Sequence, residues 1–139
     1  MRIRVDILRD DLARSRKRFE AGADRVHTEA GKALLRGLVR RTPVDIGKLV
    51  SNWRVGLGQP TRSEIEAYEP GELGSTANAN RNAAIAAGEA RIGARAAGKE
   101  IFISNSTSYQ DYVRGFEARA EDAIQEASAV VDTLKGRVL

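Results

Sequence analysis

The sequence predicts a single α+β domain over residues 1–139. Apolar side chains near both ends of the chain recur at gaps of three, four or seven positions, as they do on one face of a helix. Two shorter runs between them have the alternation or the β-branched content of strands. From the order of these patterns we expect a long N-terminal helix, a small antiparallel sheet, an Ala-rich helical insertion, and a C-terminal helix packed on the sheet.

The first predicted helix spans residues 6–41. Acidic residues occupy its first turns and arginines its last turns, an order that suits the helix dipole. The dipeptide Thr42-Pro43 ends the helix, because proline lacks the N–H group that would continue it. Gly22 marks a point where the helix can bend. The apolar positions that define its buried face are Leu8, Leu12, Phe19, Val26, Leu34 and Leu38.

Two main strands are predicted, over residues 49–57 and 100–105. A weaker strand is a candidate over residues 63–68, and an exposed Glu/Pro/Gly-rich loop follows through residues 69–74. The second main strand is rich in β-branched and aromatic residues. Alternation in the first main strand places five side chains on one side, namely Leu49, Ser51, Trp53, Val55 and Leu57.

The Ala-rich segment 75–98 is predicted to be a weakly held helical insertion. Its only large aliphatic residues, Ile85 and Ile92, lie seven positions apart and would touch the core along a narrow stripe. Disorder is the competing interpretation, because the segment buries so little apolar surface. The C-terminal helix is predicted over residues 116–135, where apolar residues recur at three- and four-residue gaps.

The composition argues against several classes of function. The chain has no cysteine, so it forms no disulfide and has no thiolate metal site or cysteine nucleophile. Its single histidine, His27, has no nucleophile motif around it. Carboxylate pairs such as Glu64 with Glu66, or Glu121 with Asp122, have no neighbour that would organise acid–base chemistry. We therefore expect no enzymatic activity, no catalytic residue, no metal site and no cofactor.

The charge of the chain is distributed unevenly. Residues 1–54 carry 14 Lys and Arg against 7 Asp and Glu, whereas residues 55–139 carry 9 against 12. Such asymmetry favours either a polyanionic partner or a head-to-tail contact between identical subunits. One function to weigh is therefore nonspecific DNA binding by the basic N-terminal helix. Its DNA-facing candidates are Arg14, Arg16, Lys17 and Arg18.

The sequence contains no apolar run near the ~20 residues that a membrane-spanning helix requires. Its first residues also lack the apolar core of a signal peptide. We therefore expect no membrane partner and synthesis in the cytoplasm.

The most informative stretch follows the first predicted helix. Asp45 is placed to bond backbone N–H groups in a turn, and Gly47 to adopt a positive φ. Leu49 and Trp53 are expected to enter the core. The stretch reads Thr42-Pro43-Val44-Asp45-Ile46-Gly47-Lys48-Leu49, followed by Trp53.

This pattern closely resembles that of the HK97 gp10-like tail-completion proteins of tailed bacteriophages, also called the minor tail protein Z group. The family usually has Thr or a similar residue where this chain has Ile46. A second match, of the strand-Asn, Tyr and Gly type, lies further along the chain. There the chain has Arg114 where the family tends to carry an acidic residue, and it lacks the Gln/Pro/Gly-rich loop often found next. The second match consists of Ile103-Ser104-Asn105, Tyr109, Tyr112 and Gly115.

The resemblance implies a structural virion protein at the head–tail junction. Such proteins form a ring, here expected to hold 6 or 12 identical subunits, that joins the tail terminator or tail tube to the head connector or portal. The first motif would then determine the fold rather than bind a ligand; its residues are Thr42, Pro43, Asp45, Gly47, Leu49 and Trp53. The second motif would face a neighbouring subunit through Asn105, Tyr109, Tyr112 and Gly115.

Overall fold

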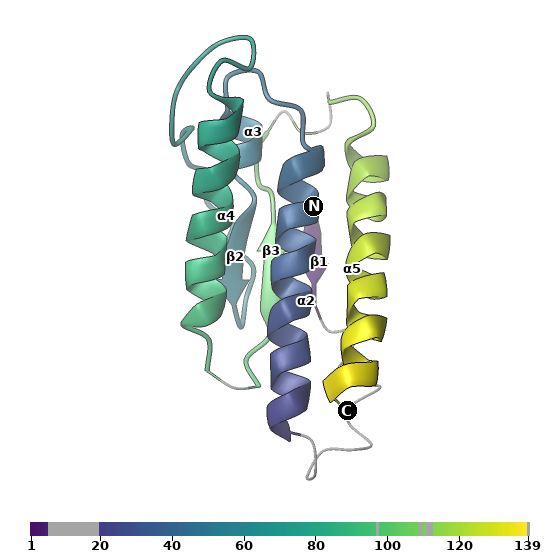
Figure 1. Cartoon of the computed structure of the whole chain (residues 1–139). Helices are drawn as coiled ribbons and strands as arrows, with labels where there is room; N and C mark the ends of the chain where they lie inside the picture. The colour runs from purple at the N-terminus through teal and green to yellow at the C-terminus, as the bar shows by residue number, and fades with distance from the viewer. Residues whose placement is uncertain (6–19, 97, 109, 111–112, 139) are drawn as a thin grey trace.

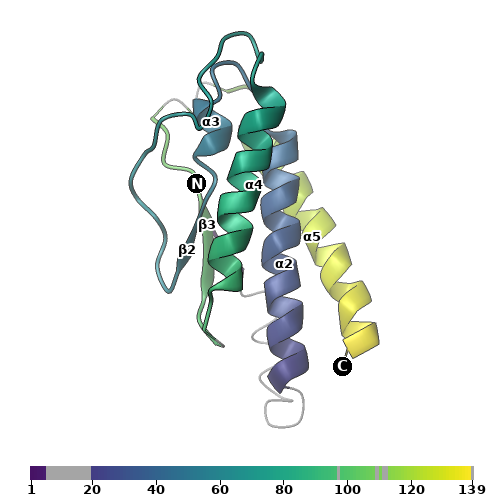
Figure 2. The ribbon, with the colours of Figure 1, turned by 60° about the vertical axis from the view of Figure 1, so that its left-hand side comes forward.

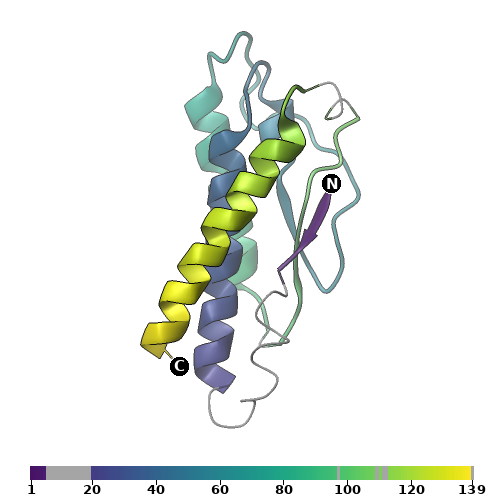
Figure 3. The same ribbon diagram turned by 90° about the vertical axis from the view of Figure 1, so that its right-hand side faces the viewer.

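The computed structural model describes the whole chain except residues 6–19, 97, 109, 111–112 and 139. Within these described residues, three long helices lie side by side on one face of a three-stranded sheet (Figure 1). Seen from the side, the helices form one layer and the strands another (Figures 2 and 3). The elements in chain order are β1 (Arg2–Arg4), α2 (Glu20–Arg41), α3 (Lys48–Ser51), β2 (Arg54–Leu57), α4 (Ala77–Gly93), β3 (Ile101–Ser104) and α5 (Phe116–Val138).

The sheet is antiparallel and has the order β1-β3-β2. Its central strand, β3, therefore pairs with two segments that lie far from it in sequence. Ile103 of β3 stands opposite Ile3 of β1 on one side and Val55 of β2 on the other. The β-branched residues of β3 are buried, which is what a central strand covered by helices requires.

Helix α2 lies between α4 and α5 and supplies much of the core. Its residues Val26, Leu35 and Val39 are fully buried. Small residues bring the helices close together: a Cβ added at Gly88 of α4 would lie 2.3 Å from the Leu35 side chain. The helical layer therefore depends on glycine where α4 crosses α2.

The predicted α+β class is confirmed, with the C-terminal helix packed against α2 and the sheet. The Ala-rich segment forms helix α4 over residues 77–93, so the prediction of a helix rather than disorder is confirmed. Ile92 of that helix is buried, and Ile85 packs against the core. Residues 20–41 of the first predicted helix form α2, whereas residues 6–19 of that prediction lie outside the described residues.

The predicted strand over residues 49–57 is partly wrong, because its first half forms the short helix α3. The N–H of Ser51 donates to the carbonyl of Gly47 at 3.1 Å, which closes one helical turn before the chain extends into β2. The weaker strand proposed at residues 63–68 is also absent, since that segment has no regular structure. Strand β1 was not predicted: only three residues long, it depends on pairing with β3.

Candidate functional site

The first motif forms a buried cluster at the end of α2. The hydroxyl of Thr42 donates to the carbonyl of Leu38 at 2.7 Å, and it accepts the indole N–H of Trp53, also at 2.7 Å. Trp53 is only 2% exposed and stacks on Phe116, the first residue of α5, with 5.5 Å between ring centroids. This cluster therefore joins α2, the strand β2 and the start of α5.

The turn between α2 and α3 requires glycine at one position. Gly47 has φ +88°, and a Cβ there would lie 2.3 Å from the amide nitrogen of Asn80. Positive φ and close packing both exclude a larger side chain. Pro43 follows the end of α2, as expected from the sequence, and Leu49 is buried.

Asp45 bonds backbone N–H groups, but not those of its own turn as the sequence suggested. Its carboxylate accepts the N–H of Leu73 at 2.8 Å, and its carbonyl accepts the N–H of Gly74 at 2.9 Å. Both partners belong to the connection between β2 and α4. Asp45 therefore ties that connection to the α2–α3 turn.

Two asparagines that the motif did not identify hold the same connection. Asn80 of α4 accepts the N–H of Glu69 at 2.9 Å and donates to the carbonyl of that residue at 2.8 Å. Asn52 makes the equivalent pair of bonds with Ile65. Both side chains are buried, and asparagine is disfavoured inside an Ala-rich helix. Helix α4 also has Asn78 and Asn82, so the sequence alone does not single out Asn80.

The two motifs of the sequence meet at Asn105. Its amide donates to the carbonyl of Leu49 at 2.8 Å, and its side-chain oxygen accepts the hydroxyl of Thr107 at 2.7 Å. Asn105 is 1% exposed. The expectation that Asn105 faces a neighbouring subunit is therefore wrong, because the side chain is buried and bonded within its own chain.

Of the other three candidate interface residues, the structure describes only Gly115. Tyr109 and Tyr112 lie outside the described residues. Gly115 is exposed and has φ +74° in the turn that begins α5, a conformation that favours glycine. Gly115 itself therefore lies at the surface.

One ion-pair cluster contains the carboxylate pair noted in the sequence. Lys48 lies against Glu64 and Glu66. The hydrogen bond from Lys48 lowers the pKa of the Glu64 carboxyl, and the same bond raises the pKa of Lys48. The two carboxylates are thus held by a lysine at the surface, an arrangement that joins α3 to the β2–α4 connection.

The four candidate DNA-facing residues, Arg14, Arg16, Lys17 and Arg18, lie outside the described residues. Within α2, two basic side chains pair with acidic ones of the neighbouring helices. Arg36 pairs with Glu89 of α4, which raises the arginine pKa, and Arg41 pairs with Glu126 of α5. These arginines connect the three helices.

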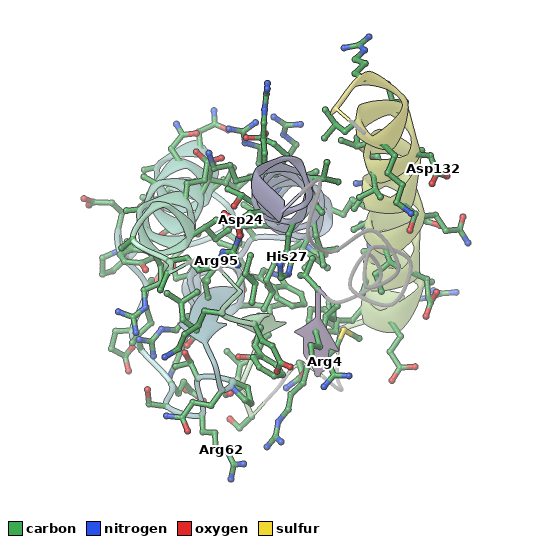
Figure 4. The ribbon with its side chains drawn as sticks, turned by 90° about the horizontal axis from the view of Figure 1, so that it is seen from below. Arg4, Asp24, His27, Arg62, Arg95 and Asp132 are labelled. Atoms are coloured by element: carbon green, nitrogen blue, oxygen red, sulfur yellow. The ribbon has the colours of Figure 1, made fainter. Side chains whose placement is uncertain are left out.

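A second cluster joins the other end of α4 to α2, as seen from below in Figure 4. The guanidinium of Arg95, whose side chain is 2% exposed, pairs with Asp24 and donates to the carbonyl of Lys99 at 2.8 Å. The His27 ring lies between this guanidinium and the carbonyl of Val5. These contacts serve packing: they anchor the segment after α4 and the end of β1 on α2.

Among the described residues, no group of three or more His, Cys, Asp or Glu side chains is placed to hold a metal ion. None of the helices in the described part of the chain is long and apolar enough to cross a membrane. Comparison with protein-family models, with the curated proteins and with solved structures finds no match.

Proposed function

We propose that this chain is a structural virion protein of a tailed bacteriophage, a tail-completion or neck component rather than an enzyme. In this proposal, identical subunits form a ring of 6 or 12 at the head–tail junction. The ring joins the tail to the head by contacting the tail terminator or tail tube on one side and the portal or connector on the other.

The observation that carries the proposal is the hydrogen bond between Asn105 and the carbonyl of Leu49. These residues belong to the two separate sequence patterns that resemble the tail-completion family. Each pattern is short and therefore weak evidence by itself. Their union in one buried, hydrogen-bonded unit supports the resemblance, because local sequence and tertiary packing then agree.

The way the motif residues are used also supports a structural role. Thr42 and Trp53 bond to each other, and Asp45 bonds backbone N–H groups. These polar groups hold together α2, β2, α5 and the connection before α4. A rigid subunit of this kind suits an assembly in which each copy must present the same surfaces to its neighbours.

The proposal is tested by deleting the gene from the parent phage or prophage and examining the lysate by negative-stain electron microscopy. We expect full heads separated from tails, or joined particles that do not infect, and rescue by the wild-type gene supplied in trans. Complementation with Trp53→Ala should fail, whereas the matched surface variant Tyr68→Ala should rescue. Normal infectious particles from the deletion would refute the proposal.

Nonspecific DNA binding by the purified chain is the alternative function. The purified chain would then bind duplex DNA with an affinity that falls steeply with salt, because each neutralised phosphate releases counterions. Replacing Arg14, Arg16, Lys17 and Arg18 by Gln would remove that affinity. Strong binding of this kind, together with normal particles from the deletion, would favour the alternative.

A further inference from the structure

A single leucine projects from the end of the molecule that carries the α2–α3 turn. Leu73 is 93% exposed, and its φ of 51° lies in the left-handed region, which a branched side chain disfavours. The hydrogen bonds to Asp45 from the N–H groups of Leu73 and Gly74 hold it there. The structure therefore presents a large apolar side chain to solvent in a fixed position, at a cost in backbone strain.

An apolar hollow lies at the same end of the molecule. It has a volume of about 400 Å³, and Ile46, which is 46% exposed, forms part of its wall. Val113, from the β3–α5 connection, forms another part, whereas Leu73 belongs to the connection before α4. The α2–α3 turn links the two: Asp45 of that turn lines the hollow, and its carboxylate accepts the N–H of Leu73. The residues that line the hollow are Pro43, Val44, Asp45, Ile46, Gly47, Leu49 and Val113.

The two sides of the turn also carry opposite charges. On the leucine side, Glu69 and Glu72 are exposed in the same loop as Leu73. On the side of the hollow, Arg114 directly follows Val113 and is exposed. Opposite charges at the rims of an apolar contact fix its register and speed its formation. The chain thus carries a projecting apolar side chain with an acidic border, and an apolar hollow with a basic neighbour.

We propose that Leu73 of one subunit inserts into this hollow on a second copy of the chain, with Glu72 facing Arg114. Because the two surfaces differ, each copy can bind one neighbour through its leucine and another through its hollow. Such a head-to-tail contact repeats and closes into a ring when the rotation allows. The closed ring is inferred from the proposed function. The contact between two copies is inferred from Leu73, the hollow and the charges beside them.

The test uses the purified full-length chain, with its association measured by sedimentation velocity and native mass spectrometry over a range of concentrations. We expect the wild-type chain to self-associate and Leu73→Ser to weaken each contact roughly 10- to 100-fold, the effect of removing one large buried aliphatic side chain. At concentrations where the wild type is monomeric, Leu73→Ser should have the same melting temperature as the wild type, because the side chain is exposed in the subunit. Val130→Ser, at an exposed apolar position on α5, is the matched control and should associate normally.

Charge exchange tests the register of the contact. Glu72→Arg and Arg114→Glu should each weaken association, and the double variant should restore it. A wild-type chain that stays monomeric, a Leu73→Ser variant that associates normally, or a double variant without recovery would each overturn the proposed contact.

Complementation in the phage separates this contact from the proposed function. If the deletion separates heads from tails but Leu73→Ser rescues fully, the proposed contact is refuted while the function stands. If Leu73-dependent association is measured but the deletion yields normal particles, the function is refuted while the contact stands.

Discussion

Replacement of Trp53 by alanine should destabilise the subunit by about 3–5 kcal/mol. The indole is 2% exposed, stacks on Phe116 at 5.5 Å, and donates to the hydroxyl of Thr42. Alanine would remove the ring from the core and leave a cavity where α2, β2 and α5 meet. Domains of this size are stable by about 5–15 kcal/mol, so the loss is a large part of the total.

Urea unfolding followed by far-UV circular dichroism measures this loss, since the fluorescence of Trp53 is removed with the residue. Tyr68→Ala is the control, because that ring is exposed, and it should change stability by less than about 1 kcal/mol. A loss below about 1 kcal/mol for Trp53→Ala would refute the placement of the indole in the core.

A double-mutant cycle isolates the hydrogen bond within this cluster. Trp53→Phe keeps an aromatic ring against Phe116 but removes the indole N–H, and Thr42→Val leaves that N–H buried without its acceptor. Each change should cost about 1–3 kcal/mol. The double variant should lose less than the sum by about 1 kcal/mol; strict additivity would contradict the bond.

Three further changes test other parts of the structure. Gly47→Ala should lower stability by about 1–3 kcal/mol, because its positive φ strains alanine and its Cβ would meet the amide of Asn80; thermal melting measures this. Asn105→Ala should cost about 1–3 kcal/mol in urea unfolding, since it removes the buried amide's bond to the Leu49 carbonyl and leaves the Thr107 hydroxyl without its acceptor, and an unchanged midpoint would contradict these bonds. Wild type should be more stable than Glu64→Gln at neutral pH, because Lys48 holds the glutamate pKa below its ordinary 4.5; this advantage should disappear as pH falls through that lowered pKa, and a difference independent of pH would speak against the ion pair.

Helical elements were predictable because their apolar residues repeat over several turns. Helix α5 was recognised from such a repeat, and α4 from its alanines and the pair Ile85 and Ile92. The segment from residue 48 to 57 was misjudged for the opposite reason. Helix α3 has only four residues and is buried on several sides. The spacing of its apolar residues therefore does not distinguish it from a strand. Leu49, Val50 and Ser51 are all buried, and the turn is shown by backbone hydrogen bonds such as the one from Ser51 back to Gly47.

The candidate site was predictable only in part. The sequence identified Trp53 as a core residue because its side chain is large and apolar, and Gly47 because glycine adopts a positive φ readily. It did not identify the partner of Asp45, since Leu73 lies 28 positions away in a loop without a pattern of its own. The burial of Asn105 was missed as well. Its side chain donates to a backbone carbonyl, and a pattern of side chains does not predict such a bond.

The position of β3 at the centre of the sheet has a consequence for synthesis. Its partners, β1 and β2, leave the ribosome long before it does, and Arg2 pairs with Ser104. Contacts between residues so far apart in sequence form late and slowly, because a long loop must first close. A nascent chain therefore holds two unpaired strands until β3 emerges, and α5 follows later still. Subunits should consequently become competent for assembly only after β3 and α5 have been translated, and a chaperone that shields the early strands would raise the yield of folded protein.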